Sequence, residues 1–151
     1  MASMRVFVRQ LDGHIAMGRQ EDTHTLILDR PVATGGTGLG FNGGHLLLLG
    51  WGGCFKSTLL AAAESRGLPV SDLHLDIEGV TTETTPSAFE TLRMRVRMKG
   101  PTPDEQDRLV RLAERWCIVS NTLASACTLE VIRAPDQESE PSAAKSGGDA
   151  G

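Results

Sequence analysis

The segment HLLLLGWGGCFKSTLLAAAESR, residues 45–66, decides the fold expected for this chain. It is too long for a typical strand, and Gly67 and Pro69 behind it are helix stop signals. Its first half is apolar on every side, and a helix of that kind cannot lie on a protein surface. We therefore expect a long helix through the centre of the core or of an oligomer, with Cys54 largely buried on it.

The segments before this helix predict strands. MRVFVRQ, residues 4–10, and THTLILD, residues 23–29, alternate between apolar and polar side chains, which indicates an antiparallel N-terminal hairpin or three-stranded meander. The loop ATGGTGLGFNGG, residues 33–44, then leads to the helix, and its glycines indicate conformational freedom.

Two more strands follow the helix. LHLDIEG, residues 73–79, places acidic side chains opposite its apolar face, and TLRMRVRMK, residues 91–99, places arginines opposite its own. Acidic and basic faces suit cross-strand pairs, so we expect an antiparallel hairpin. The arginine run is then a solvated face of the sheet rather than a ligand site.

A second helix and a last strand complete the pattern. Thr102 to Glu105 forms a capping box with Pro103 in the first helical position. SNTLASA, residues 120–126, adds a helical turn, and CTLEVIR, residues 127–133, is the last strand, with Cys127 as a core residue. This order predicts an α+β fold. The second helix has apolar positions at core-facing spacing: Leu109, Leu112, Ala113, Trp116 and Cys117.

Composition narrows the class of protein. The length of 151 residues suits one domain, for which we expect residues 1–134, followed by a disordered tail at 135–151 that has no large apolar residue. The net charge of -4 and the scattered basic residues argue against nucleic-acid binding. Without an evident secretory signal or membrane span, we expect a cytoplasmic protein with no membrane partner, in which any disulfide is transient and catalytic.

A phosphate-binding loop is one alternative for residues 50–57, which approach the pattern G-x-x-x-x-G-K-[ST]. The glycine that normally precedes the lysine is replaced by Phe55, and a bulky side chain opposes the tight backbone curl of such a loop. Asp76, a conceivable metal ligand, alternates outward on its strand. Nucleotide binding therefore remains a minor alternative.

The sequence also resembles a known family. NGGHLLLLGWGGCF, residues 42–55, followed by a helix, a hairpin and AERWCIVSNTL, residues 113–123, is similar to the OsmC/Ohr family of osmotically inducible and organic hydroperoxide resistance proteins. The resemblance runs from about Val6 to Arg133. It implies an intertwined homodimer with long helices at its centre and two sites at the subunit interface.

The resemblance further implies a thiol peroxidase that needs no metal, haem or flavin. Cys54 would attack an organic hydroperoxide and Cys117 would resolve the product to a disulfide, which an external dithiol reduces. Only a thiolate attacks usefully, and burial opposes ionisation, so a cation must lie near Cys54. An apolar wall near the thiol could come from five side chains: Leu46, Leu49, Trp51, Phe55 and Trp116.

Two departures from the family pattern bear on activity. Family members usually carry a carboxylate at the position of Gly44, where it orients an arginine, and a proline at the position of Ile118. Arg19 is our first candidate for the arginine, with Arg9 and Arg30 behind it, and His45 could replace part of the network. The alternative to a peroxidase is therefore a non-enzymatic member that binds a small apolar ligand or a partner.

Overall fold

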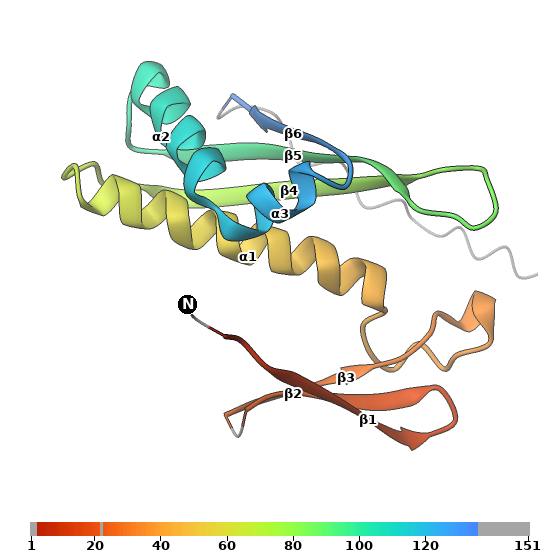
Figure 1. Ribbon diagram of the computed structural model, residues 1–151. Coiled ribbons are helices and arrows are strands. Elements are labelled where there is room, and N and C mark those ends of the chain that lie inside the picture. The colour runs from red at the N-terminus through yellow and green to blue at the C-terminus, as the bar shows by residue number, and fades with distance from the viewer. Residues whose placement is uncertain (1–2, 22, 136–151) are drawn as a thin grey trace, which may run out of the picture. The chain divides into compact units, whose positions relative to one another are not determined.

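The computed structural model describes residues 3–21 and 23–135 (Figure 1). Apart from Pro135, the predicted tail at 135–151 lies outside the described residues. Within the described ranges the elements are, in chain order, β1 (Val6–Asp12), β2 (Ile15–Gln20), β3 (His24–Leu28), the 3-10 helix η1 (Val32–Thr34), α1 (Gly43–Glu64), β4 (Ser71–Thr81), β5 (Phe89–Lys99), α2 (Pro103–Trp116), α3 (Ile118–Ala124) and β6 (Thr128–Arg133).

The chain divides into two compact units, Met1–Phe55 and Lys56–Gly151, with the boundary inside helix α1. The mixture of two sheets with helices confirms the predicted α+β class. A single domain over residues 1–134 stays a prediction.

The first unit contains the predicted three-stranded meander. Strands β1, β2 and β3 pair in that order and antiparallel, so β2 is the central strand (Figure 1). Arg19 on β2 lies opposite Phe7 on β1 and Thr25 on β3. Strand β1 is exposed along its whole length, because it forms an edge of this sheet and its apolar side chains remain in solvent within one chain.

Helix α1 begins at Gly43, two residues before the predicted segment. Trp51, Phe55 and Leu59 are fully buried. The expectation of burial on every side holds for only part of the helix, because three leucines on it are more than a third exposed within one chain: Leu47, Leu49 and Leu60.

By length and composition, α1 is apolar enough to cross a membrane. The expectation that no apolar run reaches that length is therefore wrong. Within its most apolar window, 28% of the helix is buried in the chain. The core helix of a soluble protein meets the same criteria, so this property does not identify a membrane protein.

The second unit is built on a long hairpin. Strands β4 and β5 are antiparallel, and β6 adds to β5 in parallel (Figure 1). The predicted alternation is confirmed on β5, where the apolar face is buried throughout: Leu92, Met94, Val96 and Met98. On the other face Arg93 bonds to Glu130 on β6 at 2.7 Å and to Glu78 on β4 at 3.3 Å. These bonds place Arg93 in a network within the sheet.

Helix α2 starts as predicted. The Thr102 hydroxyl accepts a bond from the Glu105 amide, the Glu105 carboxylate accepts one from the Thr102 amide, and Pro103 follows the cap. Three of the predicted core positions, Leu109, Ala113 and Cys117, are fully buried. Cys117 is the C-cap of α2 and the N-cap of α3, so the two helices meet at this residue.

Candidate active site

Cys54 lies on helix α1 and is half-buried, so its environment is less enclosed than the sequence predicted. At 100° per residue, Gly50, Leu47 and Gly43 share the Cys54 face of the helix. A Cβ built on Gly43 or on Gly50 would meet nothing within 4 Å. The thiol therefore stands at the end of a helix face on which two glycines leave open space.

A cavity of about 530 Å³ lies in the same unit, against the first two turns of α1. Leu47 is two helical turns before Cys54, which is about 10 Å along the axis. The cavity is mainly apolar, and its wall comes from all three strands and from the start of the helix: Val6, Phe7, Val8, Gly18, Arg19, Gln20, His24, Thr25, Leu26, Leu28, Gly43, Leu46 and Leu47.

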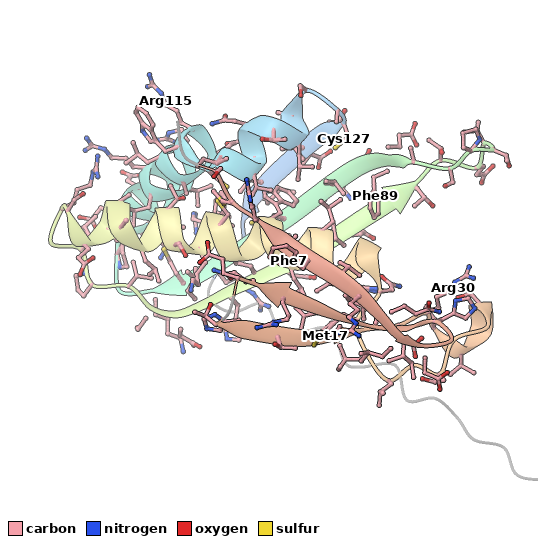
Figure 2. All side chains as sticks on the ribbon, turned by 60° about the horizontal axis from the view of Figure 1, so that its bottom comes forward. Phe7, Met17, Arg30, Phe89, Arg115 and Cys127 are labelled. Atoms are coloured by element: carbon pink, nitrogen blue, oxygen red, sulfur yellow. The ribbon has the colours of Figure 1, made fainter. Side chains whose placement is uncertain are left out.

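Arg19 is the candidate cation that lines this cavity. Its position on the central strand explains this placement, because neighbouring strands fix the backbone on both sides. Arg9 is exposed on β1, and Arg30 is exposed in the loop after β3, where Figure 2 labels it. Neither of these two side chains contributes to the cavity wall.

The first turn of α1 is capped by its own polar residues. Asn42 Oδ1 accepts a bond from the His45 amide at 2.9 Å and lies 2.7 Å from His45 Nδ1. Nine residues separate His45 from Cys54, which places them on opposite sides of the helix. Within one chain, His45 is therefore bonded to the Asn42 cap and lies away from the thiol.

Cys117 lies in the second unit and is fully buried. Its Sγ accepts a bond from the Ser120 amide at 3.4 Å, and its own amide donates to the Ala113 carbonyl at 2.9 Å. Ile118 takes the first helical position of α3 without the proline of the family pattern. The thiol group is thereby held at the junction of two helices.

The predicted apolar wall separates into three groups. Leu46 lines the cavity, whereas Trp51 and Phe55 are fully buried and belong to the core. Leu49 is 54% exposed and Trp116 is 66% exposed. The prediction that Trp116 faces the core is wrong, because α2 ends at this residue and its ring lies in solvent, with the Arg115 guanidinium 5.5 Å from the ring centroid.

Cys127 is half-buried rather than a core residue. Figure 2 labels it in the second unit, where Cys127 and Arg115 both line a cavity of about 620 Å³. Its thiol donates to the Leu123 carbonyl at 3.5 Å.

The phosphate-loop alternative does not fit the backbone. Gly50 to Ser57 are all helical within α1, whereas a phosphate cradle requires a curled loop before its helix. Among residues 3–21 and 23–135, no three His, Cys, Asp or Glu side chains form a group that could hold a metal ion.

A buried carboxylate near the start of α1 escaped the sequence analysis. Asp29, directly after β3, is 4% exposed and accepts bonds from the loop that we expected to be free. These hydrogen bonds, above all that from Thr37, lower the pKa of Asp29 to about 2. The sequence did contain a signal for this carboxylate, because Asp29 is an acidic residue between a predicted strand and a glycine-rich loop.

A family model described as OsmC-like protein matches residues 36–132. No curated protein matches the sequence in a direct search.

Solved structures match the fold closely. A hypothetical protein from Aquifex aeolicus superposes with a TM-score of 0.78 at 16% identity, over 92% of this chain and 100% of its own. An organic hydroperoxide resistance protein OsmC from Legionella pneumophila gives 0.72 at 20% identity, over 89% and 98%. The organic hydroperoxide resistance protein OhrB of Bacillus subtilis gives 0.67 at 17% identity, over 88% and 98%. With more than half of the chain matched by the family model and the same fold in these structures, the chain belongs to the OsmC-like family.

Proposed function

We propose that the protein is a thiol-dependent peroxidase that reduces organic hydroperoxides to alcohols in oxidative stress defence. The observation that carries the proposal is the placement of Cys54 on the α1 face that continues to the cavity lined by Arg19. An apolar cavity with one guanidinium suits an organic peroxide, whose hydrocarbon part is buried while its peroxide oxygens are hydrogen-bonded. Family membership and the names of the similar proteins support the same class.

The chemistry proceeds in two thiol steps. The Cys54 thiolate attacks one peroxide oxygen, the O–O bond breaks, and the alkoxide takes a proton and leaves as the alcohol. Cys54 becomes a sulfenic acid. The Cys117 thiolate then attacks the Cys54 sulfur, water leaves, and a disulfide forms. An external dithiol supplies two electrons and two protons to restore both thiols.

Two further parts belong to this proposal. A homodimer would cover apolar surface that one chain exposes on β1 and α1. A reducing cytoplasm would keep the three cysteines as thiols between turnovers. Disulfide formation also requires the Cα atoms of Cys54 and Cys117 to approach within about 7 Å.

A second candidate function is ligand binding without turnover. The observation that favours it is Gly44, which leaves the first turn of α1 without an acidic residue. If no carboxylate orients the arginine, Cys54 could remain a poor nucleophile while the cavity still binds small apolar molecules.

Titration of the reduced protein with cumene hydroperoxide tests the proposal. We expect one equivalent to consume two thiols and to join Cys54 to Cys117 in a peptide mass map. Cys54→Ser should abolish peroxide consumption, and Cys117→Ser should accumulate Cys54 sulfenic acid, while Cys127→Ser serves as the matched control with normal turnover. Full activity in Cys54→Ser would refute the peroxidase, and unreactive thiols in the unmodified chain would favour the binding protein.

A further inference from the structure

Asp29 differs from the other acidic side chains of the described residues because it is buried, at 4% exposure. Burial of a carboxylate is unfavourable unless hydrogen bonds replace its water. Asp29 stands directly after β3, in the first unit, at the start of the connection to helix α1. This connection joins the sheet that carries Arg19 to the helix that carries Cys54.

The carboxylate oxygens of Asp29 accept four hydrogen bonds. Oδ1 accepts one from the Arg30 amide at 2.7 Å, and Oδ2 accepts one from the Leu39 amide at 3.1 Å. Thr37 donates twice to Oδ2, from its amide at 3.0 Å and from its hydroxyl at 2.5 Å. A carboxylate with several such donors strongly favours its ionised form. These bonds hold the start of the loop, at Arg30, and its later part, at Thr37 and Leu39, to the same carboxylate.

Backbone hydrogen bonds also join the two ends of this loop. The Asp29 amide donates to the Phe41 carbonyl, and the Phe41 amide donates to the Ile27 carbonyl, both at 3.0 Å. A Cβ on Gly40 would lie 2.3 Å from the Ile27 carbonyl oxygen, so this approach requires glycine. Phe41 is thus held beside β3, and the next residue, Asn42, caps α1.

From this geometry we infer that Asp29 is a positioning residue for the reactive thiol. Asp29 and Thr37 set where α1 begins relative to the β1–β3 sheet. They thereby set the position of the Cys54 face of the helix relative to Arg19 on the sheet. The inference rests on the proposed function for its catalytic consequence. Its physical basis is the hydrogen-bonded loop, which joins the two elements directly.

The consequence concerns ionisation of Cys54. If the loop loosens, the start of α1 shifts against the sheet, and a cation aligned with the thiolate loses that alignment. Misplacement of a catalytic group by about 1 Å can reduce a rate by as much as 100-fold. We therefore expect a looser loop to lower the fraction of Cys54 that is present as thiolate at neutral pH. If the loop had a purely structural role, loosening it would change stability without changing that fraction.

The test compares Thr37→Val with Thr37→Ser. Valine has a similar shape but removes the hydroxyl donor, while the three backbone donors to Asp29 remain and maintain the fold. Serine keeps the hydroxyl and should restore the normal behaviour. Asp29→Asn is the stronger variant, because an amide group would face several N–H donors with only one acceptor oxygen.

The main measurement is the rate of Cys54 alkylation by iodoacetamide as a function of pH, in a Cys117→Ser, Cys127→Ser background. We expect Thr37→Val to move the midpoint of this profile to higher pH and to lower kcat/KM for cumene hydroperoxide about 10-fold at neutral pH. Thr37→Ser should match the parent chain in both measurements. Kinetic assays of kcat/KM use chains that retain Cys117.

Melting temperature and circular dichroism separate positioning from folding. If Thr37→Val and Asp29→Asn change only the melting temperature and leave the alkylation profile unchanged, the inference is wrong. If the profile shifts but the parent chain consumes no peroxide, Asp29 still positions the thiol and the peroxidase proposal fails instead. If Asp29→Asn does not fold, the Thr37 pair still decides the question.

Discussion

Gly44 is the residue at which the sequence resemblance led us to expect a carboxylate. It lies in the first turn of α1, which has no acidic side chain. A carboxylate here would sit near the positive end of the helix dipole, where it is favoured by about 0.3–1 kcal/mol. Gly44 directly follows Gly43, which lines the cavity that Arg19 also lines.

We therefore predict that Gly44→Glu increases peroxidase activity. The new carboxylate should orient the guanidinium of Arg19 and raise kcat/KM for cumene hydroperoxide on the order of 10-fold, as positioning effects of this kind can do. Steady-state kinetics measure the change. Gly44→Gln is the control, because it adds the same bulk without charge, and an equal gain in both variants would contradict the electrostatic explanation.

At residue scale the sequence left the activating cation open among three arginines. The structure shows that Arg19 lines the cavity and that Arg9 and Arg30 do not, and the role of Arg19 beside Cys54 stays a prediction. Trp116 could not be placed, because helical periodicity assigns a face but not the residue at which the helix ends. Asp29 was missed because its importance depends on a loop that folds back over it, which no local pattern encodes.

At the scale of elements, local patterns were most informative. The alternation of apolar and polar residues predicted β5, and the capping box predicted the start of α2. Both signals depend only on residues that are close together in the sequence. The parallel pairing of β6 with β5 was not predicted. Pairing across more than thirty residues depends on which edge α2 and α3 leave available, and that is a tertiary property.

The β5–β6 pair yields a pH-dependent prediction. Glu130 bonds to Arg93, and this partner lowers the pKa of the Glu130 carboxyl. A lowered pKa in the folded state means that the pair stabilises the protein above the unfolded pKa of about 4.5, and that the benefit is lost as pH falls through the folded value.

Glu130→Gln should therefore lower the melting temperature slightly at pH 7, and the difference from the parent chain should shrink as pH falls below 4.5. The effect is small because the pair is partly exposed and screened by solvent. Thermal melts at several pH values measure the difference. A difference that stays constant over the whole acid range in which the protein remains folded would show that the carboxylate charge is not its cause.

At the scale of the whole molecule, exposed apolar surface is the main unexplained feature of a single chain. On β1, Val6 is 73% exposed, Phe7 58% and Val8 68%. Val6 and Val8 share one face of the strand, and exposed apolar side chains that gather in this way often mark an interface. The same logic applies to the exposed leucines of α1, so the proposed homodimer would bury surface on both elements.

We predict that the protein in solution has about twice the 16.1 kDa mass of the chain, measured by light scattering after size exclusion. Val8→Glu should shift it towards the monomer, because residue 8 lies opposite Gly18 and a charge there would be buried in the interface without a partner. Gln10→Glu adds the same charge to an exposed polar position of the strand and should leave the mass unchanged. A monomeric parent chain would contradict the dimer.

Strand β1 also has a consequence for how the protein behaves when dilute or newly synthesised. It pairs with β2 on one side only, so its other side presents a row of backbone donors and acceptors. An apolar edge of this kind can recruit other chains into aggregates. Arg9, in the middle of the strand, opposes such stacking as a charged gatekeeper. Its replacement by an apolar residue should therefore reduce the soluble yield even if the folded protein is unaffected.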